Sequence, residues 1–300
     1  MPRVLAAALV LLACAPPTAY EPEATTPALR VVTWNVHDLF DEVDETAPPS
    51  DADTVLAPAE VEAKLARVGG VLSRLRADIY ILQEVENISL LQRLADGPLA
   101  GGGYRAALRE GFDPRGIDVG VLSRAPVRWV SHLDDRTPGG SLLWARDLAE
   151  LHLDGAPRPV VILAGHFVSR LDPTQDGRRQ LQARRARELA DELRDTAEHP
   201  VVLVAGDLND VPGSPALGPL LDDGALVDLG SELPQADAWT WSGGGARERI
   251  DYALLPREDE NLVTRVEVAA GPDVTAASDH RPVVVDLWVD AEPGLSAGTR

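Results

Sequence analysis

Acidic and amide side chains directly follow an apolar run in the segment 201–210, which reads VVLVAGDLND. The run 201–205 is rich in valine and lies between a proline and a glycine, which predicts a buried strand rather than a helix. Asp207 and Asn209 follow it, and side chains two residues apart on an extended strand point to the same side. A carboxylate can hold an attacking water and an amide can donate to an oxyanion, so the pair suits phosphate chemistry in a cleft. A plain polar turn is the alternative, because Asn and Asp are ordinary turn residues.

Two candidate metal ligands also follow predicted strands. Glu84 comes just after the apolar run 79–82, where a carboxylate is a good ligand for a hard cation. The alternative is an acid placed before the helix predicted over 87–94, since acids favour that end of a helix. Asn35 follows the short strand predicted over 29–33 and could bind a metal or begin a turn.

Two histidines are candidates for catalysis. His166 follows an apolar strand and could donate to a phosphate oxygen, although a lone histidine is more often structural. Asp279 and His280 are neighbours before the last predicted strand, so their side chains point differently and are expected to have different functions. A catalytic histidine needs a carboxylate to fix its tautomer, and Asp251 is the candidate for His280.

Charged residues near these strands suggest a substrate surface. Asp118 stands among apolar residues, so it is either at an exposed strand start or functional and paired, with Arg115 as the nearest candidate partner. Ser169 and Arg170 follow His166 and are further candidates for substrate binding.

A helix predicted over 174–194 carries several arginines, three of which, together with Arg170 just before the helix, are candidates for contact with a polyanion. With carboxylates in the same helix, a self-paired, solvated face is the alternative. The candidate arginines are Arg170, Arg178, Arg179 and Arg185.

The elements that must position these side chains alternate along the chain. Apolar residues recur at spacings of three and four over 58–76, which predicts an amphipathic helix. Together with 174–194 and about ten short strands, this pattern predicts a layered α/β domain over 29–290, followed by a disordered tail over 291–300.

The formal charge of −20 over 300 residues means that the molecule as a whole repels polyanions. This charge argues against tight, salt-resistant binding of nucleic acid. A nuclease remains compatible, because a bound cation can supply the positive charge of its site.

The N-terminus reads as a processing segment. Residues 1–14 are predicted to be a signal peptide, because they contain one early arginine and an apolar stretch too short to span a membrane. The segment ends in LLAC, which resembles the lipobox of bacterial lipoproteins, and Cys14 is the only cysteine of the chain. We therefore expect export and a membrane anchor through lipidated Cys14 at the cell envelope, on the outer membrane or the periplasmic face. A cleaved signal peptide and secretion are the alternative. Residues 15–28 are predicted to form a flexible tether.

Taken together, the motifs resemble the endonuclease/exonuclease/phosphatase superfamily, which is DNase I-like, and in finer detail its bacterial secreted-nuclease branch. The resemblance spans residues 30–289 and implies a four-layer α/β sandwich, with two central mixed β-sheets flanked by helices. His37 departs from the pattern, since glutamate or another polar residue is more usual there. The motifs are Trp34-Asn35, Gln83-Glu84, Gly165-His166, Gly206-Asp207-Leu208-Asn209, Arg249-Ile250-Asp251-Tyr252 and Ser278-Asp279-His280.

The resemblance also implies roles for the residues. Glu84 is the principal ligand of Mg²⁺ or Mn²⁺, and Asn35 and Asp279 complete or flank the metal site. Asp207 positions or activates the attacking water. The donors to the phosphate oxygens are Asn209 and His166, and His280, oriented by Asp251, is an acid/base or a charge donor.

The expected function is hydrolysis of phosphoesters by in-line attack of water. A sequence-nonspecific exported endonuclease, monomeric and with weak, salt-sensitive affinity for nucleic acid, is the favoured form. A phosphatase or phosphodiesterase for small or lipid phosphoesters is the first alternative. A non-catalytic surface lipoprotein is the second.

Overall fold

The computed structural model describes residues 28–43, 54–153 and 158–289. The predicted signal peptide with Cys14, the tail and the tether all lie outside these ranges, except that Ala28 of the tether begins the first strand.

The described residues contain two six-stranded sheets and a separate hairpin. The first sheet has the order β13-β14-β1-β2-β4-β3, and the second β5-β6-β7-β8-β12-β9. The strands of the first sheet are β1 (Ala28–Leu39), β2 (Ile79–Val85), β3 (Arg105–Leu108), β4 (Asp118–Ser123), β13 (Val263–Val268) and β14 (Val283–Trp288). Those of the second are β5 (Val127–Val130), β6 (Ala149–Leu153), β7 (Val160–His166), β8 (Val201–Asp207), β9 (Leu226–Asp228) and β12 (Asp251–Pro256), and the hairpin is formed by β10 (Trp241–Gly243) and β11 (Ala246–Glu248).

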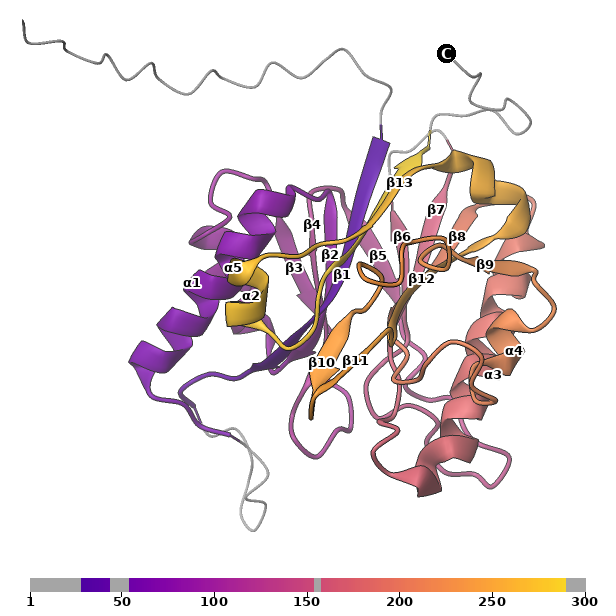
Figure 1. The fold of residues 1–300 in the computed structure, drawn as a ribbon, viewed down its shortest axis with the longest axis horizontal. Helices are drawn as coiled ribbons and strands as arrows, with labels where there is room; N and C mark the ends of the chain where they lie inside the picture. The colour runs from indigo at the N-terminus through magenta and orange to yellow at the C-terminus, as the bar shows by residue number, and fades with distance from the viewer. Residues whose placement is uncertain (1–27, 44–53, 154–157, 290–300) are drawn as a thin grey trace, which may run out of the picture.

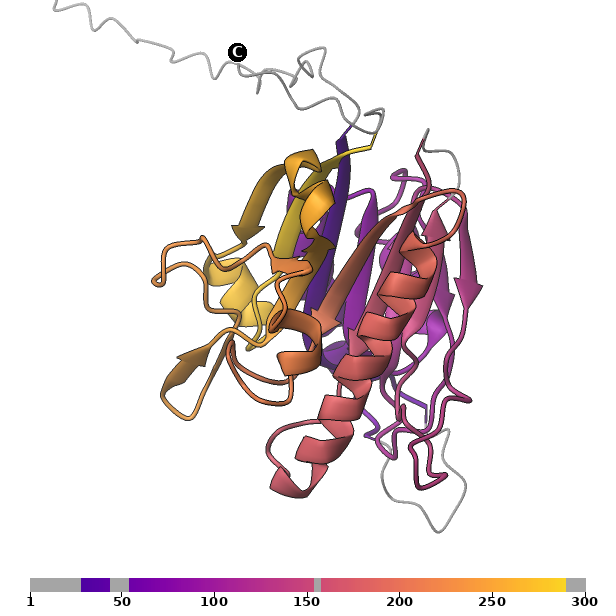
Figure 2. The ribbon, with the colours of Figure 1, turned by 90° about the vertical axis from the view of Figure 1, so that its right-hand side faces the viewer.

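Helices cover the outer face of each sheet (Figure 1). The first sheet is covered by α1 (Pro58–Leu75), α2 (Ile88–Asp96) and α5 (Pro272–Ala277), and the second by α3 (Asp176–Arg194) and α4 (Gly218–Leu221). Short 3₁₀ turns occupy Pro173–Gln175 and Arg257–Leu262. Figure 2 shows α3 lying along the outside of the second sheet. The predicted four-layer α/β sandwich is confirmed.

Three hydrophobic clusters hold these layers together. The central one lies between the sheets and takes residues from both, such as Ile81 and Val121 from the first and Ile162 and Leu203 from the second. One further cluster lies between each sheet and its helices. The central strands are therefore buried on both faces, which explains why they read as unbroken apolar runs in the sequence. Within the described residues, we find no helix with the length and apolar character needed to span a bilayer.

The polar strand ends come together because each sheet contains a parallel pair. β1 pairs with β2 in parallel, and β7 pairs with β8 in parallel, with His166 opposite Asp207. Carboxyl ends of parallel strands meet at the same sheet edge. β12 runs antiparallel to β8 and begins opposite Asp207, so Asp251 reaches the same edge from the other direction.

Candidate active site

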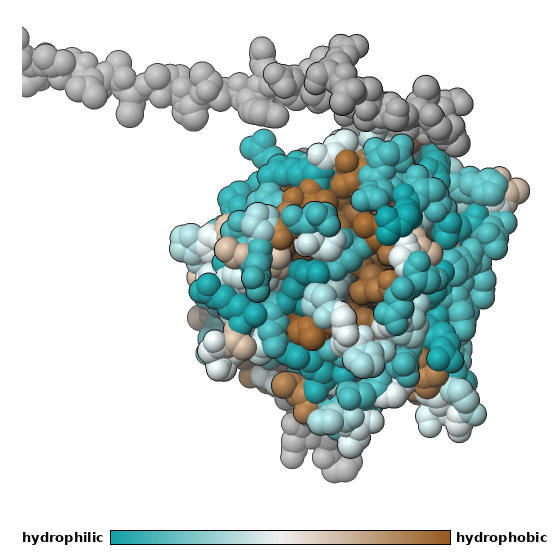
Figure 3. All heavy atoms as spheres, turned by 45° about the vertical axis from the view of Figure 1, so that its right-hand side comes forward, coloured by the Kyte–Doolittle hydropathy of each residue, from teal (hydrophilic) through white to brown (hydrophobic). Residues whose placement is uncertain are grey.

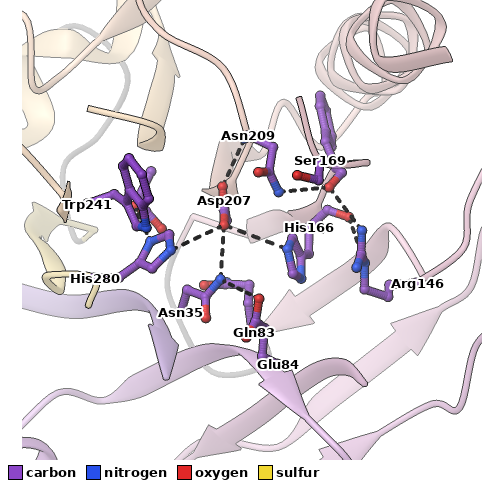
Figure 4. Close-up of polar contacts among 12 residues, drawn as sticks. Asn35, Gln83, Glu84, Arg146, His166, Ser169, Asp207, Asn209, Trp241 and His280 are labelled. Carbon is purple, nitrogen blue, oxygen red and sulfur yellow. Dashed lines mark hydrogen bonds and ion pairs between the residues drawn. The ribbon is translucent and has the colours of Figure 1, made fainter. Parts of the chain in front are cut away.

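Asp207 is the centre of the polar cluster at this edge (Figure 4). Its Oδ2 accepts a hydrogen bond from Asn35 Nδ2 at 3.0 Å. The same oxygen lies 3.6 Å from His166 Nε2 and 3.9 Å from His280 Nε2. Oδ1 accepts a hydrogen bond from the Asn209 N–H at 2.8 Å. One buried carboxylate thus contacts four of the residues that the sequence selects.

Burial, followed by the negative charge of Asp251, raises the pKa of Asp207 to about 7, although His280 and Asn35 act in the opposite direction. A carboxylate with a pKa near neutrality can accept a proton and release it again at physiological pH. The environment of Asp207 therefore suits a general base.

His280 and Asp251 form a hydrogen-bonded pair next to this base. His280 Nδ1 lies 2.8 Å from Asp251 Oδ2, which leaves Nε2 directed toward Asp207. Burial opposes the charged form of His280, but the charge and hydrogen bond of Asp251 outweigh it and raise the pKa of His280 to about 10. His280 is therefore a cation at neutral pH, able to donate a proton or to stabilise negative charge.

The second histidine has the opposite character. Burial lowers the pKa of His166 well below its ordinary value, and the charges of Arg146 and Arg115 add to the effect. His166 is consequently a neutral imidazole, and its buried Nδ1 has no hydrogen-bond partner within the described residues. A neutral ring can donate a single hydrogen bond without adding charge.

Asn209 reaches the cluster through a turn rather than through strand alternation. β8 ends at Asp207, and Asn209 has a left-handed backbone with φ of 56°. Its N–H bonds back to the Asp207 carboxylate, and its Nδ2 donates to the Phe167 carbonyl at 3.0 Å. The turn interpretation and the cleft interpretation are therefore both right, because the turn brings the amide into the cleft.

Glu84 and Asn35 face this cluster from the first sheet. Asn35 Nδ2 donates to Glu84 Oε1 at 3.2 Å, and the Asp38 N–H donates to Glu84 Oε2 at 2.9 Å. Glu84 has a φ of 64°, and the ladder from β2 to β4 shifts register between Gln83 and Val85. A positive φ is unfavourable for a residue with a Cβ, and such strain often occurs at functional sites. The bulge turns the Glu84 carboxylate toward the cleft.

Further carboxylates complete an oxygen-rich set. Asp279 Oδ1 lies 2.8 Å from His37 Nδ1, and Asp279 Oδ2 accepts from Trp241 Nε1 at 2.9 Å. Asp38 Oδ1 is buried and accepts no hydrogen bond from the described residues. Burial and the nearby charge of Glu84 raise the pKa of Asp38. Burial acts in the same direction on Glu84, but the hydrogen bond from Asn35 and the charge of Arg115 outweigh it, so the pKa of Glu84 is lowered.

This oxygen set fits a divalent cation. Carboxylate and amide oxygens are the ligands of hard cations, and closely placed negative charges with an unsatisfied oxygen are the pattern that a cation relieves. Asp207, Asp251 and His280 form a second group with one ligand atom each within 4.8 Å of one another. Because His280 is protonated at neutral pH and so has no lone pair to offer a metal, we favour Glu84, Asn35 and their neighbours as the ligands of a divalent cation.

A cavity of about 560 Å³ opens over the cluster. It is lined by most of the predicted site residues, namely Asn35, Glu84, Arg115, His166, Ser169, Arg170, Asp207, Asn209, Asp279 and His280. Asp251 lies behind His280. Asp118 is also set back from the cavity, and its Oδ1 accepts from the Gly111 N–H at 3.0 Å.

The arginines differ from the sequence-based expectation. Arg115 lies 3.6 Å from both Asp38 and Asp113, so its expected pairing with Asp118 is wrong. Arg170 pairs with Glu248 at the cavity wall.

The predicted positive strip on α3 is largely wrong. Arg179 is buried and paired with Asp210 and Asp176, and Arg185 is paired with Asp135 and Glu192. Arg178 alone of the strip residues on α3 lines the cavity, and its Nε donates to the Leu143 carbonyl. The self-paired face is therefore the better description of α3.

Arg146 lines the cavity and was missed by sequence reasoning. It is buried, donates to Asp113 at 2.8 Å, and also donates to the carbonyls of His166 and Phe167. The sequence around Arg146 gave no indication of this role, because the partners of a single arginine in a segment without periodicity cannot be predicted.

Comparison with known proteins agrees with this geometry. The model of the Endonuclease/Exonuclease/phosphatase family matches residues 32–280. A search of the curated proteins finds no match to the chain. Among solved structures, the human Nocturnin catalytic domain with bound sulfate is similar at a TM-score of 0.62 and 18% identity, covering 87% of this chain and 94% of that one.

Two further similar structures hold nucleotide ligands. D. rerio TDP2 complexed with single-strand DNA product has a TM-score of 0.59 and 17% identity, covering 86% of this chain and 98% of that one. ANGEL2, a 2',3'-cyclic phosphatase in complex with adenosine-2',3'-vanadate, has a TM-score of 0.61 and 12% identity, covering 88% and 96%. Likeness at such low identity shows the fold alone, whereas the family model spans most of the chain. The chain therefore belongs to the endonuclease/exonuclease/phosphatase family, whose members are metal-dependent phosphoester hydrolases.

Proposed function

We propose that this phosphoester hydrolase is a sequence-nonspecific endonuclease that cleaves nucleic-acid phosphodiesters by in-line attack of water. The observation that carries the proposal is the buried Asp207, with its pKa of about 7, held among Asn35, His166 and His280 beside an acidic set of oxygen ligands. These are the groups that phosphoryl transfer requires: a base, fixed donors and a site for a cation.

Each residue of the site has a distinct role in the proposed reaction. Asp207 accepts the proton of the attacking water. Neutral His166 and the free N–H of Asn209 Nδ2 are placed to donate to phosphate oxygens. The His280 cation, held by Asp251, stabilises the developing charge or protonates the leaving oxygen. Glu84, Asn35 and Asp279 would hold a divalent cation, which would neutralise charge at the phosphate when bound.

The choice of nucleic acid as substrate has two supports. A similar structure contains single-strand DNA product. Arg178 and Arg170 line the cavity and could contact phosphates that flank the cleaved bond. Since no base-reading module is recognisable in the sequence, we expect little sequence preference. The competing substrate class is a small or cyclic phosphoester, which the likeness to ANGEL2 favours.

The test compares kcat/KM of the purified full-length chain on duplex DNA, single-stranded DNA, RNA, a phosphomonoester and a 2',3'-cyclic nucleotide, with Mg²⁺ or Mn²⁺. We expect a nucleic acid to lead and EDTA to abolish turnover. Glu84→Gln should lower kcat/KM by about 100-fold or more on every substrate, because the site loses a charged cation ligand. The exposed Glu198→Gln is the matched control. If a small phosphoester had the highest kcat/KM, the phosphatase alternative would be the correct function.

We further propose export and anchoring through Cys14, in line with the bacterial secreted branch of the family. The support is the apolar stretch and LLAC sequence of residues 1–14.

A further inference from the structure

A tryptophan outside the catalytic cluster contacts two arginines. Arg281 Cζ lies 3.1 Å from the centroid of the Trp239 ring, and Arg247 Cζ lies 4.7 Å from it. Trp239 and Arg281 are half-buried, and Arg247 is exposed on β11. We call these three residues the Trp239 platform.

The Trp239 platform continues the wall of the active site. Trp241 bonds Asp279 through its indole N–H, and the Arg281 N–H donates to the Thr240 carbonyl. Trp241 and His280, which both line the cavity, pair in an isolated antiparallel bridge. Trp239 lies two residues before Trp241, and Arg281 directly follows His280. The Trp239 platform therefore adjoins the edge of the cavity.

The charge of the Trp239 platform is not balanced by direct ion pairs. Among the ion pairs of the described residues, none includes Arg247 or Arg281, whereas Arg170 nearby is paired with Glu248. Burial and the neighbouring charge of Arg247 lower the pKa of Arg281, and Asp237 only partly opposes this. Two guanidinium groups are thus held close together in a chain whose net charge is −20. An anion placed between them would relieve their repulsion.

A planar aromatic ring combined with unpaired arginines matches one class of ligand. Bases of a single strand stack on aromatic side chains, and arginine binds the adjoining phosphates. We propose that the Trp239 platform binds the nucleotide next to the scissile phosphate in an unpaired nucleic-acid strand. This inference rests on the proposed nuclease function and names the form of substrate for the same site.

The experiment compares two substrates that differ in length. Bis(4-nitrophenyl) phosphate reaches only the catalytic cluster, whereas a single-stranded oligonucleotide of about eight nucleotides would also cover the platform. The variants are Trp239→Ala and Arg247→Gln, and the matched control is Arg128→Gln, an exposed arginine on edge strand β5. Affinity for the oligonucleotide is also measured in EDTA by fluorescence anisotropy.

We expect kcat/KM on the oligonucleotide to fall about 10-fold in each platform variant, since stacking and phosphate contacts have this size. Affinity for the oligonucleotide in EDTA should fall by the same factor as kcat/KM. Hydrolysis of bis(4-nitrophenyl) phosphate should stay unchanged, and this result would also show that the variants fold. Arg247→Gln should flatten the dependence of log Kd on log salt by about 0.7.

The outcomes separate the two proposals. If the wild type cleaves the oligonucleotide and the variants equal it, or if both substrates lose activity alike, the platform assignment is wrong and the nuclease function stands. If the wild type hydrolyses the small diester but neither binds nor cleaves the oligonucleotide, both proposals fail. If the variants instead lose only binding to anionic phospholipid vesicles, the Trp239 platform is a lipid-facing surface and the assignment is overturned.

Discussion

Asp118 shows how a single buried carboxyl group can couple this fold to pH. It begins β4 with 4% of its surface exposed. Burial raises its pKa to about 7, although the hydrogen bond from the Gly111 N–H and the charge of Arg146 act in the opposite direction. The raised pKa means that folding favours the neutral acid. Its contribution to stability is therefore complete below the ordinary pKa of 3.8 and is lost as the pH rises through about 7.

Asp118→Asn should remove this dependence. The amide oxygen can still accept from Gly111, but it carries no charge at any pH. Between pH 5 and pH 8, the unfolding free energy of the variant should gain about 2 kcal/mol relative to wild type. Urea unfolding followed by tryptophan fluorescence in EDTA measures this, with the exposed Asp96→Asn as control. If the difference in unfolding free energy between Asp118→Asn and wild type did not change with pH, Asp118 would be ionised over the whole range.

The same variant also tests the substrate-binding role expected for Asp118. Because this side chain is set back from the cavity, kcat/KM should change less than about threefold, within the usual effect of a residue that touches no substrate. A larger loss of kcat/KM in a variant of unchanged stability would mean that Asp118 does contribute to substrate binding.

Residues of the site could be predicted from sequence where they border one end of a predicted strand. Asp207 and Glu84 were selected because each carboxylate comes directly after an apolar run, and the structure brings them to one cavity. Arg146 and Asp38 lie in no such position, and their partners come from other segments of the chain. Arg179 was misplaced because helical spacing shows which residues share a face but not whether that face is buried.

At the scale of elements, a close contact between β7 and β8 sets the position of the catalytic base. Gly165 lies opposite Gly206, one step before His166 and Asp207. Gly206 has a φ of 146°, and a Cβ there would lie 1.9 Å from the Gly165 carbonyl oxygen. The backbone can therefore adopt this approach only without a side chain.

Gly206→Ala should both destabilise the protein and reduce catalysis. Strands β7 and β8 must separate to admit the methyl group, so we expect a loss of about 3 kcal/mol in unfolding free energy, the range for strained backbone and overpacked cores. Asp207 would move with its strand, so kcat should fall even where the variant remains folded. Gly70→Ala is the control: this exposed position on α1 has no atom within 4 Å of the added Cβ. It should be neutral or stabilising by about 0.5–1 kcal/mol. Equal stability of Gly206→Ala and wild type in urea would refute the argument.

The elements predicted best were those buried on both faces. β7 and β8 read as continuous apolar runs, and α1 showed clear helical spacing. β6 escaped notice because Glu150 and His152 interrupt its apolar pattern, and only the structure shows them joined at 2.5 Å. The hairpin of β10 and β11 is three residues long in each arm and rich in glycine, which reads as a loop.

For the molecule as a whole, negative charge dominates and the face drawn in Figure 3 is mainly hydrophilic. Such a surface resists association with polyanions except where cations are concentrated. The cavity arginines and the Trp239 platform are such places. Affinity for nucleic acid should therefore be weak and salt-sensitive, which suits an enzyme that must release its product.

The proposed anchor is also a property of the whole molecule, and it can be tested without any enzymatic assay. Cys14 is the only cysteine of the chain, so thiol-linked lipid has no other place of attachment. A diacylglyceryl group with an added N-acyl chain would hold the protein stably, because two or more chains suffice where one does not. Bacterial cells that express the full chain should incorporate labelled fatty acid into the wild type but not into Cys14→Ser, and only the wild type should sediment with membranes. The soluble variant should keep the wild-type kcat/KM on bis(4-nitrophenyl) phosphate, because Cys14 precedes the domain that carries the site. Label in both forms or in neither would exclude the lipoprotein and favour a secreted enzyme.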